Sequence, residues 1–67
     1  MRVMSPGDVC RARAIGQRIT DARRARNRDK ELRYRKRAEA MIGQFGPEAQ
    51  REIENGRREQ LRSKKRG

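Results

Sequence analysis

The chain contains few large apolar side chains, and this scarcity limits what it can fold into. Only 31% of its 67 residues are hydrophobic, and seven of these are alanine. A chain of this length forms one domain at most and buries a small share of its surface. With 43% charged residues and a net charge of +11, it lies near the boundary of intrinsic disorder. We therefore expect folding to depend on a partner, a second copy or a bound polyanion. The larger apolar residues are mainly Val9, Ile15, Ile19, Leu32, Tyr34, Met41, Ile42, Phe45, Ile53 and Leu61.

The spacing of the apolar residues predicts an all-α protein of two or three helices. Ser5, followed by Pro6 and by Asp8 three positions later, is typical of a capped helix start. Because Gly16 weakens a helix, we expect this first helix either to end near Ile19 or to run on. Its narrow apolar stripe consists of Val9, Ala12, Ile15, Gly16 and Ile19.

A second apolar face predicts a C-terminal helical hairpin that turns at Gly46-Pro47. Helix-forming residues run from Asp21 to Phe45, and Gly46 and Pro47 suit a helix end and a new first turn. Asn55-Gly56 indicates a helix end or a point of close packing. We expect one helical unit over residues 1–67, with residues 1–4 and 62–67 disordered. We expect Met41, Ile42 and Phe45 to fold back on Ala49 and Ile53. The whole packing or partner face comprises Tyr34, Ala38, Met41, Ile42, Phe45 and Ile53.

A block of positive charge occupies residues 23–37, where nine of the fifteen residues are Arg or Lys and only Asp29 and Glu31 are acidic. Between Ala22 and Leu32 only Ala25 is apolar, so we expect a polar, arginine-rich helix that orders on binding an anion. Nucleic acid is the commonest polyanionic partner, and the alternative is a solvated face that serves solubility. The candidate nucleic-acid-binding residues are Arg23, Arg24, Arg26, Asn27, Arg28, Arg33, Arg35, Lys36 and Arg37, with Lys64, Lys65 and Arg66 of the tail.

Short stretches of the chain resemble known nucleic-acid-binding families. By composition, the basic block is similar to the arginine-rich motifs of phage antitermination proteins and viral RNA-binding peptides, which implies RNA binding. Asn27 and Arg35 have the spacing of the basic-zipper DNA-binding region, but Lys30, Glu31 and Tyr34 depart from that pattern and no leucine heptad follows. Residues 15–26 resemble the opening helix of phage-repressor helix-turn-helix domains. We expect no turn and no second helix after them, because we see no turn signal there.

The composition argues against several functions. There is one cysteine, Cys10, and no histidine, so we expect no disulfide, no zinc site, no cofactor and no enzyme activity. No apolar run is long enough for a signal peptide or a membrane span, which favours a cytoplasmic protein without membrane contact.

We therefore expect a small basic protein with a regulatory role, which binds RNA or DNA through an arginine-rich helix. The alternative is a phage- or mobile-element-type inhibitor or adaptor that places this helix on an acidic surface of a larger host protein, such as a polymerase or nuclease. A third possibility is a structural role, including a homodimer formed through the apolar face.

Overall fold

The computed structural model describes residues 2–65, and the side chains of residues 2–62. It contains three helices, α1 (Pro6–Arg24), α2 (Arg28–Phe45) and α3 (Pro47–Lys65), and no strand within the described residues. The all-α prediction is thereby confirmed, together with a helical hairpin that turns at Gly46-Pro47.

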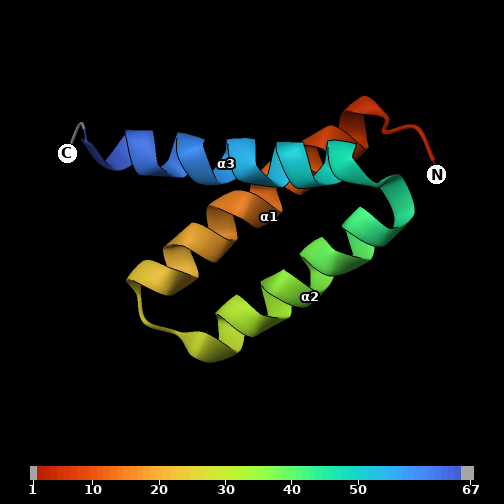
Figure 1. Ribbon diagram of the computed structural model, residues 1–67. Coiled ribbons are helices and arrows are strands. Elements are labelled where there is room, and N and C mark those ends of the chain that lie inside the picture. Colours follow the sequence, from red (N-terminus) through yellow and green to blue (C-terminus); the bar gives the residue numbers. More distant parts are fainter. Residues whose placement is uncertain (1, 66–67) are drawn as a thin grey trace.

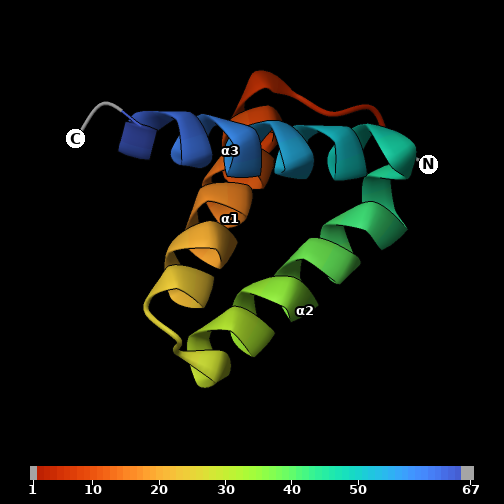
Figure 2. The ribbon, with the colours of Figure 1, turned by 60° about the vertical axis from the view of Figure 1, so that its left-hand side comes forward.

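The three helices have an open, triangular arrangement. In Figure 1, α1 and α2 meet at the turn of residues 25–27 and diverge from it, and α3 lies across α1. The rotated view keeps this arrangement (Figure 2). Helix α3 packs most extensively on α1 and least on α2, although α2 and α3 are neighbours in the sequence. The α1–α3 contact is therefore the main contact of the fold, and the sequence did not indicate it.

Helix α1 begins with the predicted capping box and continues past Gly16. The Asp8 backbone N–H donates to Ser5 Oγ at 3.3 Å, and the Ser5 backbone N–H donates to Asp8 Oδ2 at 3.1 Å. These hydrogen bonds lower the pKa of Asp8. Thr20 lies inside this helix, and its buried hydroxyl donates to the Gly16 carbonyl at 3.2 Å. Of the two bounds expected for this helix, the longer one is therefore correct.

The turn between α2 and α3 depends on glycine. Gly46 has φ 78° and ψ −150°, so it lies outside the left-handed helical region and in a region that only glycine adopts readily. Its N–H donates to the Ile42 carbonyl at 2.7 Å, which closes the end of α2. Pro47 then opens α3 at a position where no backbone N–H is needed.

Two glycines allow α1 and α3 to approach each other closely. A Cβ atom on Gly16 would overlap the Ile53 carbonyl oxygen and lie 3.0 Å from the Arg57 nitrogen. A Cβ atom on Gly56 would overlap the Arg13 carbonyl oxygen and lie 2.8 Å from the Arg13 Cα. Of the two interpretations offered for Gly56, close packing is therefore correct, and α3 does not end there. We call this contact the glycine crossing.

The interior is small and rich in alanine. Among the described residues the buried hydrophobic side chains are Ala12, Ile19, Ala22, Ala38, Phe45, Ala49 and Ile53, of which four are alanine. Because alanine fills little volume, the helix backbones approach one another, and the molecule measures only 16 Å along its shortest axis. Met4, Ile15, Tyr34, Met41 and Ile42 pack partly buried around this core.

The ends of the described chain contact or extend the helices. We expected disorder in residues 1–4 and 62–67. The Arg2 N–H donates to the Gln44 carbonyl at 3.1 Å, and Met4 packs on the core. Helix α3 runs to Lys65, four residues into the second of these segments. Residues 1, 66 and 67 lie outside the described part.

Candidate nucleic-acid interface

The basic block folds as two helix ends joined by a turn, and the prediction of a continuous arginine-rich helix is wrong. Helix α1 ends at Arg24, residues 25–27 form the turn, and α2 begins at Arg28. The Asn27 side-chain oxygen accepts a hydrogen bond from the Lys30 N–H at 3.2 Å and caps α2. An asparagine followed by Asp29 and Glu31 is a helix start signal, because acids are favoured in a first turn. The expectation that no turn and no second helix follow residues 15–26 is therefore also wrong.

The turn places Arg26 in an unfavourable backbone conformation. Its φ is 55°, and no other non-glycine residue of the described chain has a positive φ. A residue with a Cβ atom loses about 1–2 kcal/mol in this left-handed region. The exposed Arg26 side chain therefore extends from the tip of the turn at a cost to stability.

Eight of the nine basic residues of the block are exposed, and Arg24 is the exception. Arg24 is half-buried, and its Nη1 has no hydrogen-bond partner among the described residues. Asn27 is also half-buried, and its oxygen is engaged in the helix cap. Of the predicted binding residues, Arg23, Arg26, Arg28, Arg33, Arg35, Lys36 and Arg37 are thus exposed. The side chains of Lys64 and Lys65, and all of Arg66, lie outside the described part.

The exposed cations surround α2 on every side except the one that faces the core. At 100° per residue, Arg28, Arg33, Lys36 and Arg37 spread over the arc opposite the buried Ala38 and Phe45. Glu31 lies 3.9 Å from Arg23 Nε and 4.0 Å from Arg35 Nη1. Ion pairs of such length are weak when, as here, the arginine side chains are exposed. They leave the surface strongly positive.

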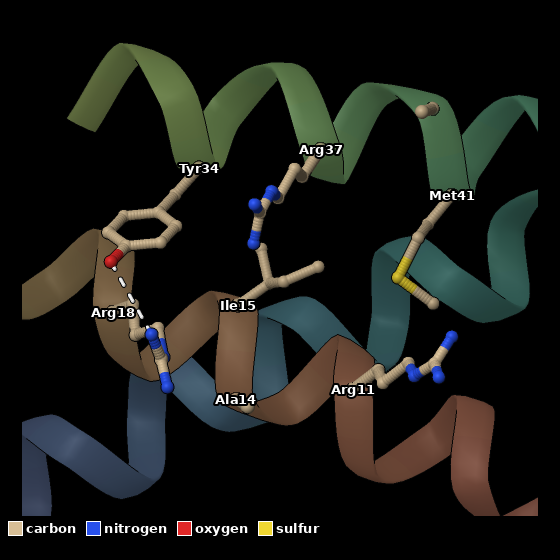
Figure 3. Close-up of a pocket in the computed structure, with 8 residues that line it drawn as sticks. Arg11, Ala14, Ile15, Arg18, Tyr34, Arg37 and Met41 are labelled. Atoms are coloured by element: carbon tan, nitrogen blue, oxygen red, sulfur yellow. Dashed lines mark hydrogen bonds between the residues drawn. The ribbon is translucent and has the colours of Figure 1, made fainter. Parts of the chain in front are cut away.

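A groove lies between α1 and α2 (Figure 3). Its volume is about 460 Å³, and Arg11, Arg18 and Arg37 line it together with Tyr34. The Arg18 guanidinium donates to the Tyr34 hydroxyl at 3.5 Å and lies 5.8 Å from the ring centroid. This hydrogen bond lowers the pKa of Tyr34. The remaining lining is apolar or small: Ala14, Ile15, Ala40 and Met41.

Sequence reasoning included Tyr34, Arg37 and Met41 but missed Arg11 and Arg18. These two arginines stand seven residues apart on α1, on either side of Ala14 and Ile15. A seven-residue spacing puts them on one helix face, and that signal was available in the sequence. What the sequence did not show is that α2 lies opposite this face.

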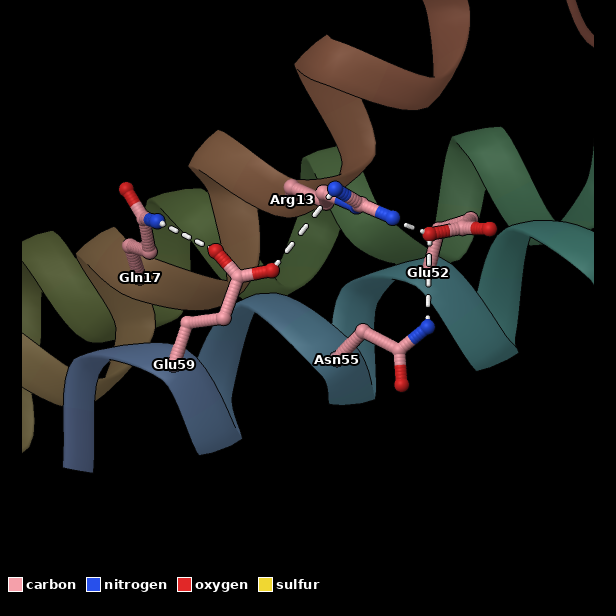
Figure 4. Close-up of polar contacts among 5 residues, drawn as sticks. All are labelled: Arg13, Gln17, Glu52, Asn55 and Glu59. Atoms are coloured by element: carbon pink, nitrogen blue, oxygen red, sulfur yellow. Dashed lines mark hydrogen bonds and ion pairs between the residues drawn. The ribbon is translucent and has the colours of Figure 1, made fainter. Parts of the chain in front are cut away.

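Acidic residues collect on the other side of α1, beside α3 (Figure 4). Arg13 Nε donates to Glu52 at 3.0 Å, and Arg13 Nη1 lies 3.7 Å from Glu59. The Gln17 amide donates to Glu59 at 3.4 Å, and the Gln60 amide donates to Asp21 at 2.7 Å. The hydrogen bond from Arg13 lowers the pKa of Glu52 and raises that of Arg13. We call these contacts the polar ladder.

The predicted packing face lies in or around the core. Ala38, Phe45 and Ile53 are buried, whereas Tyr34, Met41 and Ile42 are half-buried. Phe45, Ala49 and Ile53 lie on the two sides of the Gly46 turn, as the hairpin requires.

Comparison with known proteins places the chain in no family: no protein-family model matches it, and no curated protein or solved structure matches it. Within the described residues, no helix has the length and apolar character needed to span a bilayer, and no three Cys, Asp or Glu side chains cluster as metal ligands. A function must therefore be inferred from the charged surface and the groove.

Proposed function

We propose that this protein binds nucleic acid through a basic surface formed by the α1–α2 turn and the exposed side of α2. The observation that carries this proposal is the exposure of eight cations in residues 23–37 beside only two acids. A helix with cations on three sides can lie in a groove and reach the phosphates of both walls.

Charge neutralisation is the proposed mechanism of binding. Each cation that reaches a phosphate releases condensed counterions, so affinity falls as salt rises. If six phosphates are contacted, the slope of log affinity against log salt is about −5. RNA and DNA present the same phosphate chemistry, so the test includes both.

The test is fluorescence anisotropy across a salt series with a hairpin RNA, a duplex DNA and a single strand. The triple variant Arg28→Gln, Arg33→Gln, Lys36→Gln on α2 should make the salt slope shallower by about 3. A matched control replaces three exposed arginines of α3, Arg51, Arg58 and Arg62, by Gln. We expect this control to retain the slope. Absence of binding to all three polymers at low salt, or a flat salt dependence, would contradict the proposal.

The alternative of a protein partner has one observation in its favour. Leu32 is 56% exposed and lines a hollow together with Ile19, Ile42 and Ile53, and this hollow is bordered by four cations and two acids: Arg23, Arg35, Lys36, Arg57, Glu39 and Glu54. An apolar side chain among more cations than acids suits an acidic protein surface. A pull-down after nuclease digestion separates the two functions: a single retained protein that Leu32→Ser releases would support this alternative, and loss of all partners on digestion supports nucleic acid.

A further inference from the structure

The α1–α2 groove has the chemistry of a site for a flat anion. Three guanidinium groups, those of Arg11, Arg18 and Arg37, border it, and no carboxylate is among its lining residues. Elsewhere on α1 the arrangement is the opposite, since Arg13 is paired with both Glu52 and Glu59. A volume of about 460 Å³ is in the range of ligand-binding sites.

The groove also offers surfaces suited to a planar, weakly polar group. Ile15 of α1 and Met41 of α2 provide apolar surface on facing sides of the groove, and the Tyr34 ring stands at one end (Figure 3). Tyrosine rings and guanidinium planes are the surfaces on which unpaired bases stack. A mononucleotide unit combines the two required parts, because it joins a flat base to a phosphate.

The groove is continuous with the basic surface of α2. Arg37 belongs to both, since it ends the exposed basic block and also lines the groove. A strand that follows α2 would thus pass the mouth of the groove. A base held in a duplex could not enter, so the occupant must be unpaired.

We propose that the α1–α2 groove holds one unpaired nucleotide of the bound nucleic acid, with its phosphate drawn to the guanidinium groups that border the groove (Arg11, Arg18 and Arg37) and its base against the apolar and aromatic lining (Ile15, Tyr34 and Met41). This inference rests on the proposed function and adds a substrate class to it: hairpins or duplexes that carry an extruded or bulged base.

Arg18 can turn to this occupant at little cost. The Arg18–Tyr34 hydrogen bond is 3.5 Å long, at the outer limit of such bonds, so Arg18 loses little when it turns to a phosphate. A charge-assisted, bidentate contact to phosphate is stronger than the contact it replaces. Arg18 therefore serves as a contact that exchanges one acceptor for another.

The test compares three hairpins of identical stem, each as RNA and as DNA: fully paired, with one bulged nucleotide, and with an abasic unit at the bulge. Anisotropy with the full chain should give about tenfold tighter binding of the bulged hairpin, the size expected for one stacked base. The abasic hairpin, which retains the phosphate and the flexibility but lacks the base, should lose most of that gain.

A matched pair of variants localises the preference. Ala40 lines the groove, whereas a side chain at Gly43, on the same helix, would meet open space. Ala40→Leu adds apolar volume inside the groove without a change of charge, and Gly43→Leu adds the same side chain outside it. Circular dichroism of both variants checks that the helices remain.

The outcomes distinguish the groove from the general basic surface. Loss of the bulge preference in Ala40→Leu, with retained affinity for the paired hairpin and a retained preference in Gly43→Leu, supports the inference. Equal binding of all three hairpins, or a bulge preference that survives in Ala40→Leu, overturns the inference and leaves the proposed function standing. Absence of binding to every hairpin overturns both.

Discussion

The two sides of α1 differ in how closely they pack and in whether their charges are paired. At the glycine crossing, Gly16 and Gly56 bring two backbones into contact, and the polar ladder beside them pairs Arg13 with acids. At the groove, three arginines and a tyrosine line the space between α1 and α2, and no acid lines it. A chain with few apolar residues thus places its tightest packing on one side of a helix and its unneutralised charge on the other.

The largest expected effect breaks the crossing side of this comparison. Gly56→Ala places a methyl group against the Arg13 backbone, which cannot move as a flexible side chain can. We expect the free energy of unfolding to fall by about 3 kcal/mol, at the upper end of overpacking costs. Urea denaturation followed by circular dichroism measures it. The control is Gly43→Ala, which meets open space within α2 and should gain about 0.5–1 kcal/mol. Equal stability of Gly56→Ala and the unaltered chain would contradict the close approach.

The next prediction compares two nearby arginines of α1, Arg11 in the groove and Arg13 in the polar ladder, by their effects on affinity and on stability. Arg11→Gln removes a guanidinium from the groove, so affinity for a bulged hairpin should fall about tenfold while the urea midpoint is retained. Arg13→Gln removes the partner of Glu52 and Glu59, so the urea midpoint should fall while affinity is retained. Anisotropy and urea titration on both variants give the four values. The same response from both arginines would show that the two sides of α1 do not differ as described.

A smaller effect is expected at the turn of residues 25–27, which joins α1 to α2. Arg26→Gly relieves the left-handed backbone strain at φ 55°. Because glycine also gains freedom in the unfolded chain, we expect a net stabilisation of only about 0.5 kcal/mol. The salt slope of nucleic-acid binding should become shallower by about 1 as one phosphate contact is lost. A variant that is both less stable and unchanged in its salt slope would refute this assignment.

The smallest effect concerns pH and the polar ladder. The pKa of Glu52 is lower in the folded chain than its ordinary value of 4.5, chiefly because Arg13 donates a hydrogen bond to it. Its contribution to stability is therefore complete above about pH 4.5 and is lost as pH falls through the lowered folded pKa. Urea midpoints of the unaltered chain and of Glu52→Gln should differ at pH 7 and converge in acid. A difference that stays the same from neutral pH into strong acid would contradict the linkage.

Local features of the sequence predicted much of the fold. The Ser5–Asp8 capping box and the Gly46-Pro47 turn each depend on residues a few positions apart, and both are present as expected. The turn at residues 25–27 was missed because Ala25 and Arg26 are ordinary helix residues, and the signal lies only in Asn27 and the acids after it. Arg26 carries no signal of its positive φ, since the conformation is imposed by the helices on either side.

Features that join distant residues were not predictable in this way. Gly16 and Gly56 meet across forty residues of chain. The sequence allows close packing at Gly56, but it does not identify Gly16 as the residue that Gly56 meets. The groove was missed for the same reason, because Arg11 and Arg18 gain their meaning only when Tyr34 and Arg37 lie opposite. Periodicity shows which face of a helix is apolar and which is charged, but it does not show which other helix will cover that face.

The alanine-rich core has a consequence for how this protein melts. Alanines expose little apolar surface when the chain unfolds, so the heat-capacity change and the enthalpy of unfolding should both be small. A small enthalpy makes the thermal transition broad, and a small heat-capacity change makes the stability curve flat. For a chain of this size, each kcal/mol lost shifts the melting temperature by about 4–8 °C. The melting temperature is thus a sensitive readout of single substitutions. A bound polyanion should raise it, because binding stabilises the folded chain.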